Sequence, residues 1–433
     1  MTTHHPGPEN TGGTGTAVPE NPFVPAAEAL LPELRTLRRR LHARPEVGLR
    51  LPETQRAVLQ ALEGLGLEIV TGTSLSSVVA VLRGGAAGDA QGPVVLLRGD
   101  MDALPVEEAT GLDFASTNGA MHACGHDLHV AGLVGAAKLL HARRDELPGT
   151  VLFMFQPGEE GFGGGRIMIE EGVLDAAGEQ PVAAYAIHVD AKTPYGRFVT
   201  RSGPIMAGVS ALRIRFEGTG GHAAAPHLAV DPVPVAAQAI LAVQSFAARR
   251  IPASDPAVIT IGPLSSDSSA GNVLARSVSM EANMRHFSEG TLALLRDELP
   301  EFLRGLARAH GCEATVEFVP SYPATVNDPH ETSEVVAGLT KVHGPERVVT
   351  LADPAMASED FSYVLQRIPG ALVFLGALPE GTEPEGAAPM HSEGARFDDG
   401  VLGLQAATLA DLAWRRLEKA AAPNPVSGDG VNR

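Results

Sequence analysis

The segment from Met121 to His129 concentrates side chains that bind metals. It holds three histidines, one cysteine and one aspartate within nine residues, and imidazole, thiolate and carboxylate are the usual ligands of zinc and similar ions. Cys124 and His126 stand two residues apart, a spacing that does not share one helix face, so they converge only from a loop. The alternative is a polar loop that caps the apolar helix after it.

Two adjacent carboxylates, Glu159 and Glu160, follow a predicted strand from Val151 to Phe155. The intervening Gln-Pro-Gly indicates that the strand has ended, so the two side chains can point in different directions. One can then hold a metal ion while its neighbour accepts a proton from water, which is the division that metal-assisted hydrolysis requires. For this pair taken alone, a solvated acidic turn is the alternative.

Other candidate residues also stand where predicted strands end. The strand from Val94 to Leu97 runs into Asp100 and Asp102, and the strand from Ala183 to Ile187 ends in His188. In open α/β sheets the binding crevice lies at the carboxyl ends of the strands. The repeated placement of acids and histidines there predicts an active site at that edge of the sheet.

The elements that position these residues alternate between apolar strands and helices, which predicts an α/β fold with a largely buried sheet. The pattern changes after about Gly203. A strand-helix-strand-strand-helix-strand order follows, the ferredoxin-like arrangement, which can close as its own α+β domain. We therefore predict a disordered tail over 1–24, an α/β catalytic domain over 25–204 and 320–420, an inserted domain over 205–319 and a second tail over 421–433.

The composition excludes several classes of protein. With 33 basic and 51 acidic side chains, the 433-residue chain has a formal net charge of -18. That charge argues against nucleic-acid binding, because affinity for phosphate comes mainly from clustered Lys and Arg. No apolar run approaches the roughly 20 residues of a membrane-spanning helix, and the first residues lack the features of a signal peptide. With only Cys124 and Cys312 present, disulfides do not organise the fold, and a reducing cytoplasm is the expected location.

Six segments along the chain carry most of these chemical residues: RGDMDALP (98–105), MHACGHDLH (121–129), QPGEE (156–160), GGHAAAPH (220–227), SEDF (358–361) and HSE (391–393). In this order they resemble the amidohydrolases that cleave N-acyl amino acids, such as hippurate hydrolase and the indole-acetyl-amino-acid hydrolases of plants. Those enzymes belong to the aminoacylase and carboxypeptidase G superfamily of two-metal enzymes. The resemblance covers the chain from Leu41 to its C-terminal helix and implies a metallopeptidase-type catalytic domain.

The resemblance also implies a role for each matched residue. Glu159 would be the general base, and Asp102 the acid behind it. Two divalent ions (Mn, Zn, Co or Ni) would be held by five ligands: Cys124, His126, Glu160, His188 and His391.

In relatives the inserted domain serves as lid and dimerisation surface, so the resemblance implies a homodimer or a dimer-based oligomer. His222 would match the lid histidine that reaches the active site of the other subunit, where it stabilises the oxyanion. Asn272 and Arg285 would match lid residues that hold the substrate carboxylate. For Arg285 the alternative is a surface charge at the end of a strand.

Three features depart from the family's pattern. Better-known branches have a histidine ligand where this chain has Asp100, which points to the cysteine-containing subgroup. The sequence after His391 lacks the usual proline and acidic-aromatic run, and Asn118 to Ala120 stand where relatives often carry an arginine. The remaining histidines are expected behind the ligands or in loops: His122, His129 and His227.

The implied function is hydrolysis of the amide bond of N-acyl amino acids by a metal-activated water. One alternative is a dipeptidase or carboxypeptidase of the same superfamily. Another is a catalytically silent metal-binding protein, although every matched position is filled here. A nucleophilic enzyme that uses Cys124 is disfavoured, because a metal-bound thiolate is a poor nucleophile.

Overall fold

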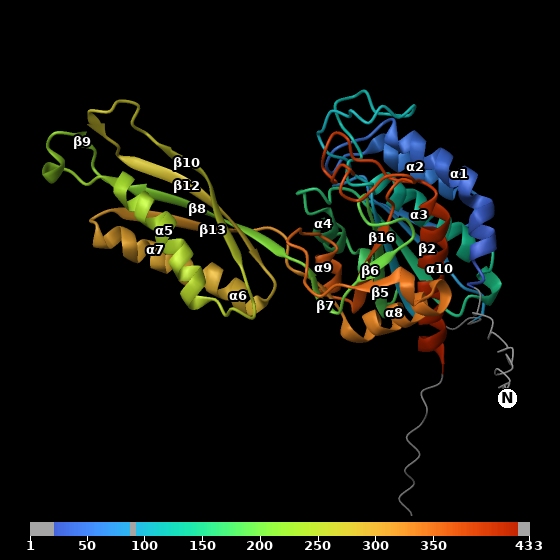
Figure 1. Cartoon of the computed structure of the whole chain (residues 1–433). Coiled ribbons are helices and arrows are strands. Elements are labelled where there is room, and N and C mark those ends of the chain that lie inside the picture. Colours follow the sequence, from blue (N-terminus) through green and yellow to red (C-terminus); the bar gives the residue numbers. More distant parts are fainter. Residues whose placement is uncertain (1–20, 87–91, 423–433) are drawn as a thin grey trace, which may run out of the picture.

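The computed structural model describes residues 21–86 and 92–422 and consists of a larger and a smaller part joined by a narrow connection (Figure 1). The larger part is built on an eight-stranded mixed sheet with the order β1-β2-β4-β3-β5-β16-β6-β15. Its strands are β1 (Glu68–Thr71), β2 (Val78–Arg83), β3 (Val94–Asp100), β4 (Thr150–Gln156), β5 (Ala183–Asp190), β6 (Phe198–Thr200), β15 (Val348–Thr350) and β16 (Gly370–Gly376).

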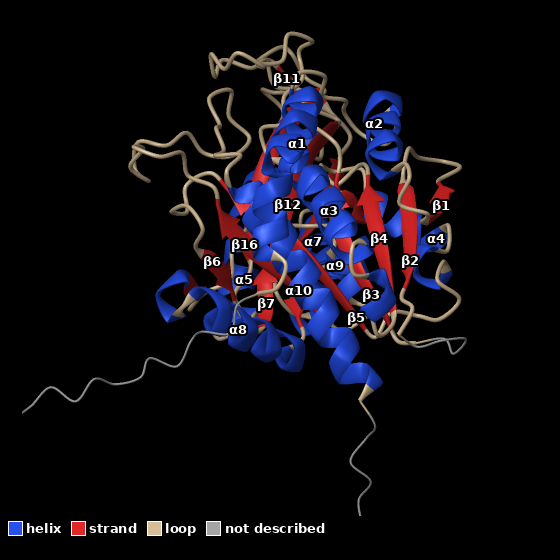
Figure 2. Cartoon of the chain, turned by 90° about the vertical axis from the view of Figure 1, so that its right-hand side faces the viewer, coloured by secondary structure: helices blue, strands red, loops and turns tan. Residues whose placement is uncertain are grey.

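Helices cover both faces of this sheet (Figure 2). Val95 and Leu97 of β3 face one apolar cluster and Leu96 faces the other, so the central strands are apolar on both sides. The prediction of an α/β fold with a largely buried sheet is confirmed. One face packs against α1 (Val24–His42), α2 (Pro52–Leu62), α3 (His126–His141), α8 (Pro329–His343) and α10 (Val401–Ala421), and the other against α4 (Gly164–Glu170) and α9 (Ser362–Leu365).

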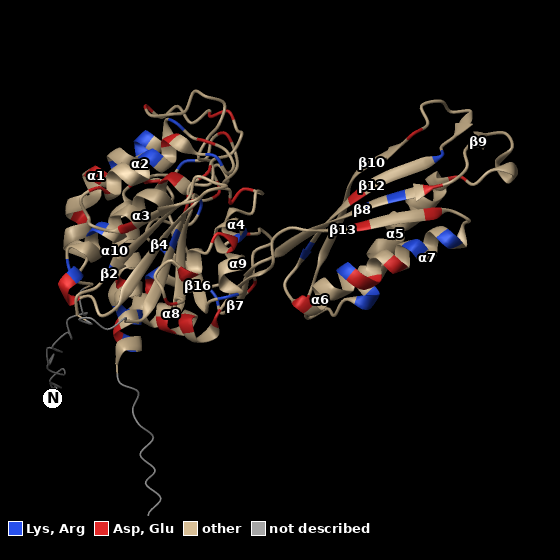
Figure 3. Cartoon of the chain, turned by 180° about the vertical axis from the view of Figure 1, so that it is seen from behind, with Lys and Arg blue, Asp and Glu red and all other residues tan. Residues whose placement is uncertain are grey.

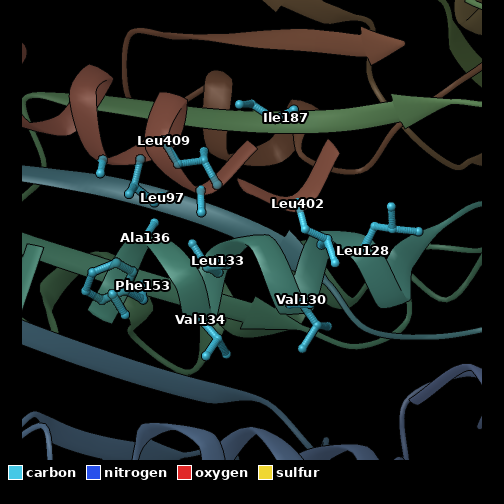
Figure 4. Packing of buried hydrophobic residues seen from close by; sticks show 14 of the residues in the cluster. Leu97, Leu128, Val130, Leu133, Val134, Ala136, Phe153, Ile187, Leu402 and Leu409 are labelled. Atoms are coloured by element: carbon cyan, nitrogen blue, oxygen red, sulfur yellow. The ribbon is translucent and has the colours of Figure 1, made fainter. Parts of the chain in front are cut away.

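Helix α3 packs on the sheet beside α10, also contacts α1, and is buried almost throughout (Figure 4). Its glycines allow this close approach. A Cβ atom on Gly135 would lie 2.7 Å from the Cβ of Ala406 and 2.9 Å from the Leu34 side chain, and one on Gly132 would lie 2.5 Å from Gln405. Such contacts are too short for any larger residue, so the small residues fix how tightly α3 packs.

The smaller part is an antiparallel four-stranded sheet with the order β10-β12-β8-β13 and helices on one face. Strand, helix, strand, strand, helix, strand follow one another along the chain, so the predicted ferredoxin-like fold of the insert is confirmed. Its elements are β8 (Gly208–Glu217), α5 (Pro232–Arg250), β10 (Val258–Ser266), β12 (Ser277–His286), α6 (Glu289–Ala293), a π-helical turn (Leu294–Glu298), α7 (Leu299–Ala309) and β13 (Glu313–Pro320).

Alternation along β8 explains how this sheet is covered. Leu212, Ile214 and Phe216 are buried against the helices, whereas the intervening Arg213 and Arg215 are exposed on the open face. A period of two residues is what a half-buried strand requires. Acidic and basic side chains are interspersed over the molecule, for example along α7 (Figure 3).

Two short ribbons were not foreseen from the sequence. β7 (Gly203–Met206) pairs with β14 (Thr325–Asn327) where the two parts join, and β9 (Gly221–His222) pairs with β11 (Val273–Leu274) at the far end of the insert. Two to four residues carry too little periodicity to be recognised as strands.

The start of the fold also differs from expectation. Residues 1–20 and 423–433, which make up most of the predicted tails, lie outside the described residues. Asn21 and Phe23, which we assigned to the leading tail, are buried, and the Phe23 ring meets Trp414 edge to face at 5.7 Å. The apolar ring therefore belongs to the core. Within residues 21–86 and 92–422, no helix has the length and apolar character to cross a membrane.

Candidate metal centre and active site

A left-handed glycine brings Cys124 and His126 together. Gly125 has φ +80°, and a Cβ atom there would lie 2.5 Å from a methyl group of Val189, so only glycine fits. Cys124 precedes this turn and His126 is the first residue of α3, so the two side chains converge without sharing a helix face. Both are buried beside His188 at the end of β5, and ligand atoms of the three lie within 4.8 Å of one another.

The structure gathers all five expected ligands at the carboxyl edge of the large sheet. The Cys124 sulfur lies 3.5 Å from Nε2 of His188 and 3.2 Å from Nε2 of His391. Nε2 of His391 is 3.1 Å from Oε1 of Glu160, which is 3.9 Å from Nε2 of His126. Cys124 therefore stands between two donor groups, one with His126 and His188 and one with Glu160 and His391.

Hydrogen bonds orient two of the histidine rings so that one nitrogen of each can bind a cation. Nδ1 of His126 meets the carbonyl of Asp102 at 2.9 Å, and Nδ1 of His188 meets the carbonyl of Val189 at 2.7 Å, which leaves Nε2 of each ring as the ligand atom. Nε2 of His126 is buried with no hydrogen-bond partner among the described residues.

The thiol of Cys124 is suited to the same task. Burial raises its pKa, but the neighbouring His188 and His126 outweigh burial and lower the pKa to about 6. A thiolate with imidazole and carboxylate neighbours is a donor set for zinc and similar divalent ions. The residues present therefore fit a metal centre.

His391 reaches the cluster from a loop in an unusual backbone conformation. Among the described residues it is the one non-glycine residue with a positive φ, +64°. Its backbone N–H donates to the carbonyl of Ala123 at 3.0 Å, which pins the loop beside Cys124. Such conformations cost about 1–3 kcal/mol and are typical of functional sites.

The two adjacent glutamates differ in environment. Glu159 is buried, and burial followed by the nearby Glu359, Glu160 and Asp360 raises its pKa well above the usual value. For Glu160, burial is outweighed by its bond to His391 and by His126, so its pKa is lowered. Neighbouring acids with pKa values pushed apart suit a proton acceptor and a metal ligand respectively.

Asp102 holds the turn that carries both glutamates. Its carboxylate accepts the backbone N–H of Glu159 at 2.9 Å and that of Glu160 at 3.1 Å. Its backbone carbonyl fixes His126, as described above. Asp102 thus acts on the orientation of its neighbours through their backbone and ring atoms.

Asp100 lies beside the cluster with both oxygens engaged. Nη1 of Arg98 donates to Oδ2 at 2.7 Å, and Nδ1 of His129 hydrogen-bonds to Oδ1. Nε2 of His129 accepts the N–H of Val189 at 2.8 Å, so neither ring nitrogen is free. The Asp100 oxygen bound to Arg98 is still 3.5 Å from Nε2 of His126, which places it next to one of the expected ligands.

Sequence reasoning missed a buried ionic network beneath the glutamates. Arg98 pairs with Glu359 at 2.9 Å and with Asp360 at 3.1 Å, and Nε2 of Gln156 donates to Asp360 at 2.6 Å. The backbone N–H of Asp360 lies 3.4 Å from the Glu159 carboxylate. Glu359 and Asp360 belong to the SEDF segment, which was matched as a motif without a role.

A cavity of about 570 Å³ opens beside the donor cluster. Arg285, at the end of β12 nearest the large sheet, lines it and donates to Oγ of Ser358 at 3.2 Å. The other polar side chains on the wall include Asp190, Thr193, Ser321 and Tyr322. The apolar part of the wall consists of Val199, Met206, Val209, Leu351, Ala355, Ala357, Phe374 and Met390.

His222 and Asn272 lie elsewhere. They meet at the β9–β11 ribbon, where the N–H of Ala223 donates to the carbonyl of Asn272 at 3.0 Å, and both side chains are exposed. This ribbon is at the end of the insert farthest from the large sheet (Figure 1). Within one chain the structure therefore brings Arg285 to the cavity but not His222 or Asn272.

A buried α/β sheet with a ferredoxin-like insert and a cysteine-histidine-glutamate cluster at its edge defines a metal-binding hydrolase. The family model described as peptidase family M20/M25/M40 matches residues 96–415. The chain belongs to this family.

Relatives agree on the family and differ in activity. The chain is 37% identical to thermostable carboxypeptidase 1 of Saccharolobus solfataricus over 87% of this chain and 93% of that protein. It is 35% identical to the IAA-amino acid hydrolase ILR1-like 2 of Arabidopsis thaliana over 90% and 87%. Among solved structures, the YXEP protein of Bacillus subtilis, described as a dinuclear metal binding peptidase, superposes with a TM-score of 0.77 at 31% identity, covering 90% of this chain and 99% of that one.

Proposed function

We propose that this amidohydrolase or peptidase hydrolyses N-acyl amino acids to a carboxylate and a free amino acid. The observation that carries the proposal is the wall of the cavity, which offers a long apolar surface and one cation, Arg285, for a single carboxylate. Two carboxylates outside the paired glutamates reach this wall. Glu359 pairs with Arg98, and one oxygen of Asp190, Oδ1, accepts the N–H groups of Lys192 and Thr193.

This wall favours an acyl group over the free amino terminus of a dipeptide. A substrate ammonium group in a mostly apolar cavity needs a carboxylate with free lone pairs, because unpaired buried charges are costly. An uncharged acyl chain has no such need and gains by covering apolar side chains. The name of the Arabidopsis relative, a hydrolase of amino-acid conjugates, supports the same substrate class.

Two divalent ions are the proposed cofactor, in line with the dinuclear relative. His126 and His188 would hold one ion, Glu160 and His391 the other, and Cys124 lies within reach of both groups. When bound, such ions lower the pKa of water from 15.7 to about 7 and polarise the amide carbonyl.

The chain's own groups would then move the proton and hold the substrate. Glu159, with its raised pKa, accepts the proton of the attacking water and delivers it to the leaving amine nitrogen. Asp102 keeps Glu159 and Glu160 in their orientations through the two backbone N–H groups. The planar guanidinium of Arg285 binds the substrate carboxylate with paired hydrogen bonds.

His222 and Asn272 would complete the site of a second subunit, His222 at the oxyanion and Asn272 at the substrate carboxylate. Two features of the insert support such a homodimer. β10 is an edge strand with an exposed outer side, and Leu228 and Leu241 are 79% and 74% exposed. Unpaired strand edges and exposed apolar side chains are typical of association surfaces.

Cleavage of peptides from their carboxyl end is the second candidate, favoured by the 37% identity to a carboxypeptidase. Both candidates need Arg285 for a free carboxylate, and they differ in what precedes the scissile bond. A catalytically silent metal-binding protein is disfavoured, because the base and all five ligands are present.

The test is an activity screen of protein reconstituted separately with Mn, Zn, Co and Ni. The panel comprises N-acetyl, N-benzoyl and indole-acyl amino acids, matched dipeptides with a free amino terminus, and N-blocked peptides. We expect acyl amino acids to give the highest kcat/KM. Higher values for the peptides would assign the chain to the carboxypeptidase function.

A further inference from the structure

We propose that Tyr322 is a positioning residue that fixes the turn of Glu159 and Glu160 from the side of the insert. The proposal rests on the proposed function, since Tyr322 is assigned no contact with substrate and acts through the orientation of Glu159. Tyr322 lies two residues beyond the end of β13, on the segment that leads back from the insert into the large sheet.

The phenol spans the turn. Its Oη donates to the backbone carbonyl of Glu159 at 2.6 Å and accepts the N–H of Gly163 at 3.1 Å. These two groups flank the sharp part of the turn, so the hydroxyl bridges it. It adds to two backbone hydrogen bonds, from the Gly161 N–H to the Glu159 carbonyl at 2.7 Å and from the Gly164 N–H to the Gly158 carbonyl at 3.0 Å. The side chain is 7% exposed and lines the cavity, which keeps competing water from most of its surface.

The composition of this turn makes the hydrogen bonds of the Tyr322 hydroxyl important for its conformation. Gly158, Gly161 and Gly163 all have positive φ angles, of 75°, 88° and 67°. Glycine loses the most conformational freedom on folding, so a turn with three of them is intrinsically loose. Asp102 binds the two glutamate N–H groups, and Tyr322 binds the Glu159 carbonyl.

Tyr322 is itself anchored to the connection between the two parts. Its carbonyl accepts the N–H of Val209, on the chain entering the insert, at 2.8 Å. Oη of Tyr363, in α9, donates to the carbonyl of Ser321 at 2.6 Å, and the rings of Tyr322 and Tyr363 meet edge to face at 6.1 Å. The geometry thus links both strands of the connection to the general-base turn through one phenol.

The experiment compares Tyr322→Phe with Tyr363→Phe in the metal-loaded, full-length protein. Each variant removes one hydroxyl that donates to a backbone carbonyl and keeps the ring, but only Tyr322 touches the turn. The readouts are kcat and KM for an N-acyl amino acid, bound metal, Tm, and amide hydrogen exchange of the peptide that contains Gly163.

For Tyr322→Phe we expect kcat to fall about tenfold, a factor that corresponds to about 1.4 kcal/mol. KM and metal content should be unchanged, and exchange at Gly163 should accelerate. Tyr363→Phe should leave exchange of the turn unaltered and change kcat less than twofold.

Equal exchange and kcat in Tyr322→Phe and wild type would overturn the proposal, as would equal effects of the two variants or loss of metal. The exchange measurement needs no substrate and tests the hydrogen bonds of the Tyr322 hydroxyl even if both variants are inactive or mildly destabilised. Full activity of Glu159→Gln would instead refute the proposed function and leave accelerated exchange at Gly163 as an independent result.

Discussion

Candidate site residues lie at the edge of the large sheet and at the tip of the insert, and the two groups differ in burial. At the sheet edge most candidate side chains are buried. The Asp102 carbonyl orients the His126 ring, and the Asp102 carboxylate accepts the backbone N–H groups of both glutamates. At the tip, His222 and Asn272 are exposed on a two-residue ribbon. The first group is preorganised within one chain, whereas the second is exposed and lies away from the cavity of its own chain.

We expect the largest effect from removal of metal, which tests the buried site at the sheet edge. Chelator-treated protein should lose all measurable hydrolysis and recover it with Mn, Co, Zn or Ni, because the buried donor groups are prepared for cations. Elemental analysis must accompany the assay. Full turnover in verified metal-free protein would remove the basis for the whole sheet-edge site.

The second largest effect distinguishes the roles of the two adjacent glutamates. Glu159→Gln should retain metal and lower kcat about a thousandfold, since it removes only the proton acceptor. Glu160→Gln, its matched control one residue away, should lose metal affinity. If elemental analysis gave the reverse pattern, the two roles would have to be exchanged.

The tip of the insert is tested by subunit exchange. His222→Ala should lower kcat about a hundredfold, as expected for loss of one oxyanion donor. Mixed with Glu159→Gln, it should regain roughly a quarter of wild-type activity, because half the dimers become hybrids with one intact site. Activity that stays at the average of the two variants would show that His222 serves its own chain or no site.

The smallest effect concerns Arg285, which reaches the cavity within its own chain. Arg285→Ala should lower kcat/KM for acyl amino acids about tenfold to a hundredfold, the range for a hydrogen bond to a charged group. Carboxamide analogues of the same substrates should be affected much less. Equal losses for both would make Arg285 a structural residue that supports Ser358.

Local patterns predicted much of this arrangement. Alternating strands and helices were sufficient for the α/β sheet, and the strand-helix-strand-strand-helix-strand order was sufficient for the insert. The Pro-Gly before Glu159 indicated that the adjacent glutamates would diverge, and the structure places Glu160 beside His391 and Glu159 beside Glu359 and Asp360.

Local patterns could not predict contacts between segments that are far apart in the sequence. His391 lies 267 residues from Cys124, and only the resemblance pointed to it. Arg98 meets Glu359 across 261 residues, so nothing local showed that SEDF would neutralise a buried guanidinium. Phe23 was assigned to a tail because the residues before it contain no apolar stretch, whereas its ring completes the core next to Trp414.

The tight packing of α3 has a consequence for altering the range of substrates. Gly132 and Gly135 leave no room for larger side chains along the helix that begins with His126, so we expect a substitution there to shift this proposed ligand. Leu351 and Ala355, by contrast, line the cavity beside the donor cluster and lie outside the strands and helices. Variation in acyl-group size should therefore be sought at these two wall positions, where a change of volume leaves the ligands in place.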